Sequence, residues 1–192
     1  MIRSTILLLI MVWTFGASAQ TLVYDIVLFG KTIGTATVER ALEGEVTEYR
    51  MNTSVEAKVM FKERTSSADI RLVFRNDVLQ EGTVVRERDG DRTDVSITRQ
   101  GQRYTVLRNG ERKEQNEPIR LVSTQFFFEE PAGRQRVYVE KLGEWVDIES
   151  KGDGVYITHV DGARNTYHYR AGQMVELEMK KGVRVYMRLQ QG

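Results

Sequence analysis

The sequence predicts an all-β fold: an antiparallel meander that forms a strongly curved sheet, a half-barrel or a barrel, with one short helical segment near 123–130. Two observations carry this prediction. Apolar and polar residues alternate with a period of two over many short segments. Glycines recur at intervals of 8 to 11 residues, the length of one strand and one tight turn, in two separate series: Gly90, Gly101 and Gly110, and then Gly143, Gly154, Gly162, Gly172 and Gly182.

The alternation is clearest from residue 49 to residue 61. Odd-numbered positions are mostly apolar and even-numbered positions mostly polar, so we expect one face of this strand to be buried. A helix would instead need apolar residues at every third or fourth position. The face expected to be buried comprises Tyr49, Met51, Thr53, Val55, Ala57, Val59 and Phe61.

Turn residues separate the remaining strands. Asn-Gly and Asp-Gly pairs favour the positive φ angles of two-residue hairpin turns, and they occur at Asp89-Gly90, Asn109-Gly110 and Asp161-Gly162. The predicted strands are 22–29, 32–40, 47–61, 67–75, 78–88, 92–99, 102–108, 111–117, 135–141, 144–151, 155–160, 164–170, 173–180 and 183–190.

The first 19 residues have the features of a signal peptide. Arg3 precedes an apolar run over 6–15, and Ala17-Ser18-Ala19 supplies the pattern of small residues at a cleavage site. The run is shorter than the ~20 residues that a membrane-spanning helix needs. We therefore expect cleavage after Ala19, a periplasmic or secreted protein, and no transmembrane anchor after cleavage.

Composition limits the class of protein. The 28 Lys and Arg residues include Arg3, so residues 20–192 carry 27 of them against 27 Asp and Glu. This balance argues against nucleic acid as a partner. Cysteine is absent, so stability must come from burial without disulfides. A chain of this length buries roughly 70% of its unfolded surface, and we expect residues 20–192 to form a single all-β domain.

One segment departs from the meander, between the two prolines Pro118 and Pro131. It has no turn glycine and no alternation. Ser123 is a candidate helix cap, and Pro131 a candidate stop. We expect one or two helical turns across one end of the sheet.

The sharpest local feature of this segment is the triplet Phe126, Phe127 and Phe128. One interpretation is a plug that closes the open end of a barrel. The other is a lid over an apolar cavity, which makes the three residues candidate ligand-binding residues. Since three consecutive aromatics cannot all face inward from one helical turn, we expect at least one to lie near the surface or a cavity mouth.

No catalytic or metal-binding group stands out. The only histidines, His159 and His168, lie on the hairpin around Asp161-Gly162. With a two-residue turn they share a face but stand four residues apart, roughly 13 Å, too far for one metal ion. In that register Tyr156 faces Tyr167 across the hairpin. We expect no catalytic residues, no metal and no cofactor, although a pair of carboxylates remains an open alternative.

Two stretches carry a family resemblance. The first runs from Tyr24 to Gly34, and the second contains Pro118-Ile119, Ser123 and the Phe-rich run from Phe126 to Pro131. Together they resemble an uncharacterised family of exported bacterial envelope proteins with a domain of unknown function. The resemblance implies an extended antiparallel sheet and a Gram-negative periplasmic location, and it implies no activity.

These expectations lead to a ranked set of functions. The first is non-enzymatic binding of an apolar or amphipathic small molecule such as a lipid. The second is a structural or protein-interaction module of the cell envelope, with an envelope protein as partner. A hydrolase that uses carboxylates ranks third.

Overall fold

A computed structural model gives the fold of residues 18–59 and 62–190. The predicted signal peptide lies outside these residues except for Ser18 and Ala19, which begin the first strand. Phe61, the last residue of the predicted buried face, also lies outside them. The part of the chain that the structure describes contains no helix long and apolar enough to cross a membrane.

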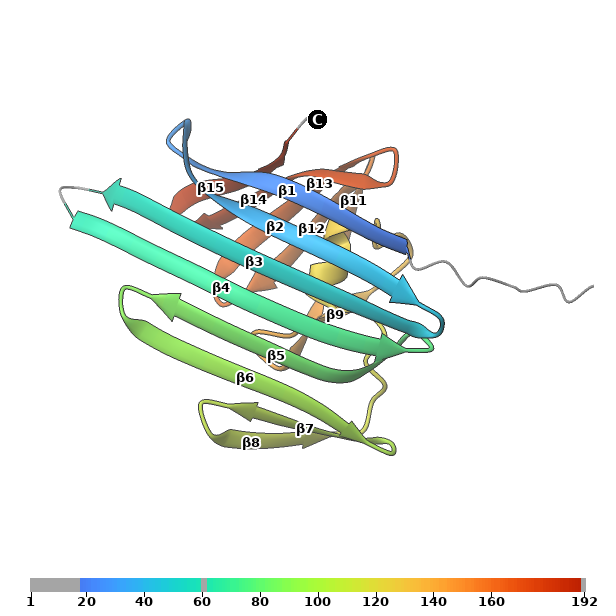
Figure 1. The fold of residues 1–192 in the computed structure, drawn as a ribbon. Coiled ribbons are helices and arrows are strands. Elements are labelled where there is room, and N and C mark those ends of the chain that lie inside the picture. Colours follow the sequence, from blue (N-terminus) through green and yellow to red (C-terminus); the bar gives the residue numbers. More distant parts are fainter. Residues whose placement is uncertain (1–17, 60–61, 191–192) are drawn as a thin grey trace, which may run out of the picture.

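Within these residues, thirteen strands form one antiparallel sheet, and the predicted all-β meander is confirmed (Figure 1). Within the described residues, consecutive strands are joined by short turns, apart from one long connection after β8. The strands are β1 (Ser18–Leu28), β2 (Lys31–Glu43), β3 (Val46–Val59), β4 (Lys62–Arg75), β5 (Val78–Arg88), β6 (Asp91–Gln100), β7 (Arg103–Arg108), β8 (Glu111–Gln115), β11 (Glu149–Gly152), β12 (Val155–Val160), β13 (Ala163–Arg170), β14 (Gln173–Lys181) and β15 (Val183–Leu189).

The first and last strands of the chain pair with each other inside this sheet. In the antiparallel pair of β1 and β15, Tyr24 lies opposite Leu189 and Leu28 opposite Val185. The spatial order is therefore β11 to β15, then β1 to β8. Strands β11 and β8 are the two edges and do not pair with each other, so the sheet is open and barrel closure is not confirmed. Both edge strands are short, exposed and charged, which discourages pairing with another chain.

The connection between β8 and β11 departs from the meander, as the sequence predicted. It contains a 3₁₀ helix, η1 (Ser123–Phe127), and a separate two-stranded sheet of β9 (Arg136–Val139) and β10 (Glu144–Asp147). The helical segment expected near 123–130 is thus confirmed as a 3₁₀ helix that ends before Pro131. Ser123 is its first residue and not its cap, because the cap position belongs to Val122.

The predicted strand 144–151 is wrong. Its first part, β10, pairs with β9 up to Asp147, whereas its second part, β11, pairs with β12 from Glu149 onward. Between them the Ile148 amide donates a hydrogen bond to the Gln135 carbonyl, 2.7 Å away, outside both sheets. Alternation along the chain indicates which face of a strand is buried, but it does not indicate where the chain leaves one neighbouring strand and pairs with another.

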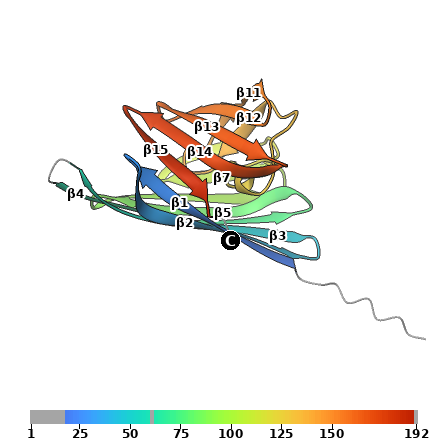
Figure 2. The same cartoon turned by 90° about the horizontal axis from the view of Figure 1, so that it is seen from above.

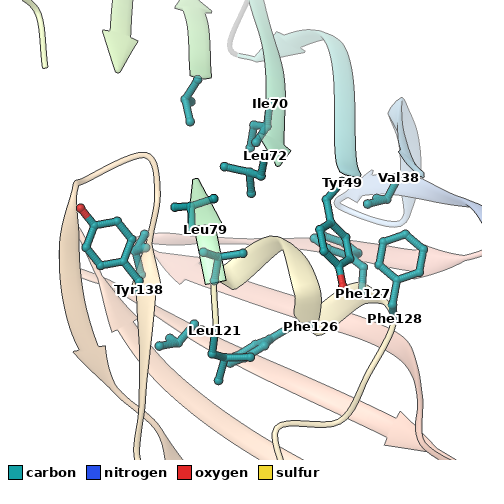
Figure 3. Close-up of a cluster of buried hydrophobic side chains, with 14 of the residues drawn as sticks. Val38, Tyr49, Ile70, Leu72, Leu79, Leu121, Phe126, Phe127, Phe128 and Tyr138 are labelled. Carbon is teal, nitrogen blue, oxygen red and sulfur yellow. The ribbon is translucent and has the colours of Figure 1, made fainter. Parts of the chain in front are cut away.

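The two halves of the sheet form two layers with the hydrophobic core between them. Figure 2 shows β12–β15 on one side and β2–β5 on the other. We call the side of the sheet that faces this space the inner face. It carries Tyr24, Val38, Leu72 and Tyr167, all of which are buried. A close-up of the core shows the side chains of the segment that contains η1 lying among those of the sheet (Figure 3).

Two tight turns depart from the usual residue preferences, with Phe29 in the β1–β2 turn and Ala171 in the β13–β14 turn at positive φ. The β5–β6, β7–β8 and β12–β13 turns place Asp or Asn before Gly with positive φ, as turns of this kind prefer. The β1–β2 turn instead places Phe29 there, with a φ of 50°. Phe29 is 74% exposed, so burial does not offset a conformation that costs roughly 1–2 kcal/mol for most residues.

We therefore expect Phe29→Asn to stabilise the fold. Asn tolerates positive φ better than Phe, and the free energy of unfolding should rise by roughly 0.5–1 kcal/mol in urea denaturation. Phe29→Leu is the matched control, because it keeps an apolar side chain in the same conformation and should leave stability unchanged. A less stable Phe29→Asn protein would contradict this account of the turn.

Candidate functional site

The structure buries all three residues of the candidate site. Phe126, Phe127 and Phe128 are 0%, 5% and 8% exposed. The expectation that at least one lies near the surface is therefore wrong. A 3₁₀ helix has three residues per turn, so consecutive side chains point in three different directions. Because the segment lies between the two layers, each of these directions meets protein.

Each phenylalanine packs against a tyrosine from a different strand. Tyr167 comes from β13, Tyr24 from β1 and Tyr49 from β3, so the contacts reach both layers. Two of the pairs have the edge-to-face geometry that aromatic rings favour, and the third is tilted. The ring centroids are 5.0 Å apart in Phe126–Tyr167, 5.1 Å in Phe127–Tyr24 and 5.7 Å in Phe128–Tyr49.

Side chains of the sheet also bind the backbone of this segment. The Tyr169 hydroxyl donates to the Phe126 carbonyl at 2.7 Å, and Gln173 Nε2 donates to the Phe127 carbonyl at 2.7 Å. The Tyr24 hydroxyl lies 3.3 Å from the same Phe127 carbonyl. A buried carbonyl without a partner costs about 1–3 kcal/mol. These bonds satisfy the buried carbonyls of Phe126 and Phe127, which belong to no strand.

A buried carboxylate holds the other end of η1. Glu140 follows β9 and is 2% exposed. Its Oε2 accepts the Ser123 backbone N–H at 3.0 Å and the Ser123 hydroxyl at 2.9 Å, and its Oε1 accepts the Thr124 hydroxyl. Three donors compensate for much of the cost of burying this charge. The role of Glu140 is therefore to fix η1.

The tyrosines around the segment hold their protons strongly. Burial raises the pKa of Tyr167 to about 12, with a smaller opposing effect of the hydrogen bond to Thr158. Burial also raises the pKa of Tyr24, Tyr138 and Tyr169. At neutral pH these hydroxyls are protonated, as the Tyr169 hydroxyl must be in order to donate to the Phe126 carbonyl.

Taken together, these contacts favour a plug over a lid. The segment binds both layers through rings, carbonyls and amides. A depression of about 300 Å³ lies elsewhere, on the outer face of β2–β4, and its lining includes the polar or charged residues Glu39, Arg50 and Asp69.

Away from the plug, the inner face is only half-buried. Along β3, Tyr49 is buried, but the inward residues that follow it are half-exposed, although the sequence predicted burial along the whole strand. Neighbouring strands show the same change at this end of the sheet. We define the open stretch as the apolar residues of this half-exposed part of the inner face, namely Ile33, Met51, Val55, Ala57, Met179 and Val185. The polar Thr53 lies between Met51 and Val55 on the same face and is half-exposed as well.

The histidine hairpin has the predicted register. Val160 pairs with Ala163 across the two-residue turn, and the Tyr156–Tyr167 pair is confirmed. His168 lies opposite Val155, and His159 lies opposite Arg164, so the two imidazoles belong to positions four residues apart. Within residues 18–59 and 62–190, no three His, Asp or Glu residues are placed to hold a metal ion.

Sequence reasoning found the plug but missed the open stretch. The alternation of β3 continues unchanged from Tyr49 to Ala57, so it contains no signal for where burial stops. Sequence reasoning also missed Lys141, which follows Glu140 in the β9–β10 turn. Lys141 is the last residue of the predicted strand 135–141, and alternation assigned it no special role.

Comparison with known proteins gives one match. Residues 24–190 match the family described as "Domain of unknown function (DUF6134)". No curated protein and no solved structure matches the chain. The family match covers most of the sequence and confirms the resemblance to a family with a domain of unknown function.

The plug interpretation predicts a large loss of stability for Phe127→Ala. Removing a buried aromatic ring should lower the free energy of unfolding by about 3–5 kcal/mol in urea denaturation. The control is Phe29→Ala, which removes an exposed ring and should change stability by less than about 0.5 kcal/mol. A loss below about 1 kcal/mol at Phe127 would contradict the plug.

The buried tyrosines predict loss of stability in alkali. Unfolded tyrosines ionise near pH 10, whereas the pKa of Tyr167 is raised to about 12 in the folded protein. Between pH 10 and pH 12, unfolding releases protons from the buried tyrosines. The contribution of these tyrosines to stability is therefore complete below about pH 10 and is lost as the pH rises towards 12. We expect the melting temperature to fall in this window, less steeply in Tyr167→Phe. Phenolate absorbance of the buried tyrosines that appears before the sheet unfolds would contradict this.

Proposed function

The chain belongs to the DUF6134 family, whose domain has no assigned function, and we propose that it binds an apolar or amphipathic small molecule, such as a lipid, without catalysing a reaction. In this proposal the two layers act as an open half-barrel. The plug fills one part of the space between them, and the ligand lies on the open stretch. No cofactor takes part.

The half-exposure of the open stretch is the observation that carries the proposal. Its six side chains are apolar, and they continue an inner face that is otherwise buried. From Met51 to Ala57 the β3 part of the stretch spans seven residues, and the six steps between them cover about 20 Å at ~3.3 Å per residue. An extended acyl chain fits this length. Each methylene group that it buries contributes about 0.8 kcal/mol.

We also propose that the protein acts after export, in the periplasm. The apolar run over 6–15 and the cleavage pattern that ends at Ala19 support this location. Cleavage there removes Ser18 and Ala19 from β1, which pair with Leu42 and Ala41. The buried part of β1, from Tyr24 to Leu28, remains. The equal numbers of acidic and basic residues from residue 20 onward support a partner other than nucleic acid.

A structural or protein-interaction module of the cell envelope is the second candidate. The observation that favours it is Phe29, an exposed aromatic residue held at positive φ. Val183 is also exposed, and the pairing of Leu28 with Val185 places both residues at one end of the sheet. An exposed aromatic residue that costs stability is typical of a contact with a partner. Loss of a crosslinked envelope protein in Phe29→Asn would support this function.

Two neighbouring substitutions on β3 test ligand binding. Val55 faces inward on the open stretch, whereas Ser54 is exposed on the outer face. We expect Val55→Asp to weaken binding of hexadecanol at least about tenfold, because a carboxylate beside the chain must be desolvated. Ser54→Asp should bind as the unchanged protein does.

Binding is measured by titration calorimetry on protein from which lipids have been extracted, and native mass spectrometry before extraction looks for a bound species. Circular dichroism confirms that both variants fold. If no long-chain probe binds the unchanged protein, or if the two variants bind equally well, the open stretch is not a ligand site.

A further inference from the structure

Two cationic side chains, one in a turn and one on the inner face of the sheet, lie close enough for their charges to interact. Lys141 belongs to the turn between β9 and β10, and Arg86 lies on β5. Arg86 alternates with the inward residue Val84 and pairs with Ala68, which in turn pairs with Thr53 of β3. With strands ~4.8 Å apart, the Arg86 backbone is about 10 Å from β3. Both side chains are half-exposed.

In the described part of the chain, neither cation has a carboxylate partner. Arg86 and Lys141 take part in no salt bridge and no side-chain hydrogen bond there. The carboxylates nearest to Lys141 are already occupied. Glu140 accepts bonds from Ser123 and Thr124, and Asp161 accepts Lys181 at 3.4 Å.

The electrostatic environment of Lys141 is unfavourable for its charge. Burial lowers the pKa of Lys141, and the positive charges of Arg86 and Lys181 lower it further. Glu140 and Asp161 act in the opposite direction without cancelling this effect. An anion placed between Lys141 and Arg86 would compensate both charges and form charge-assisted hydrogen bonds.

We propose that Lys141 and Arg86 bind the anionic group of an amphipathic ligand whose apolar chain lies on the open stretch. This inference rests on the proposed function and narrows its ligand to single-chain amphiphiles that end in a carboxylate or a phosphate. Apolar contact holds the chain, and the two cations select the end group and set the direction of the ligand. Carboxylate and phosphate both offer the oxygen acceptors that guanidinium and ammonium groups bind.

The test compares four probes that share one chain length: hexadecanoate, hexadecyl phosphate, hexadecanol and hexadecyltrimethylammonium. Each is titrated into the full-length mature protein by calorimetry, below its micelle-forming concentration. We expect at least one anionic probe to bind about tenfold more tightly than hexadecanol, and the cationic probe to bind most weakly. The ratio between carboxylate and phosphate identifies which anionic group the site prefers.

Lys141→Gln and Arg86→Gln should each abolish most of the preference for the anionic probe over hexadecanol. The matched control is Lys151→Gln, which removes an exposed cation from the edge strand β11 and should keep the preference. Because Lys141→Gln removes a charge that burial disfavours, the melting temperature of the ligand-free variant should not fall. Arg86→Gln carries the test by itself if Lys141→Gln does not fold.

The possible results separate the two proposals. If hexadecanol and both anionic probes bind the unchanged protein equally, or if Lys141→Gln and Arg86→Gln keep the anionic preference, the role of these cations is wrong and the proposed apolar site stands. If none of the four probes binds, both proposals fail.

Discussion

The fold depends on burying a short helical segment, η1, which belongs to no strand, between two layers of sheet. Such a segment brings unpaired backbone groups into an apolar space, where each one is costly. The tyrosine hydroxyls, Gln173 and Glu140 supply the missing partners at both ends of η1. The three phenylalanines then fill the space around it. The polar and apolar parts of the segment are therefore both necessary for the layers to come together.

This inserted segment also explains why the opposite end of the inner face is only half-buried. Two sheets in direct contact pack about 10 Å apart. A helical turn with aromatic side chains between the layers prevents that approach, and the inward residues from Met51 to Ala57 are only half-buried. The plug and the open stretch are thus two results of one geometry. Arg86 lies two strands from the β3 part of this second region, and its charge acts on Lys141.

The sequence predicted the features that depend on neighbouring residues. Alternation and turn pairs identified the strands, the Asp161-Gly162 register and the helical segment near Phe127. It did not predict that β15 pairs with β1, because hydrogen bonds between distant strands leave no local pattern. The inward direction of Tyr49 and Val55 was predictable because it follows from local alternation. Their different degrees of burial were not predictable, because burial depends on which distant residues lie across the space between the layers.

The pairing of β1 with β15 has a consequence for how the chain reaches its final state. Tyr24 lies opposite Leu189, so β1, which is synthesised first, can pair with β15 only after the end of the chain has been synthesised. The hairpins on either side form from local contacts and need no such wait. A chain that stops after β14 would expose two additional strand edges, on β1 and β14, whose unpaired backbone groups could pair with a strand of another molecule. The final seven-residue strand therefore determines whether the two series of hairpins join into one sheet or remain two separate sheets with exposed, aggregation-prone edges.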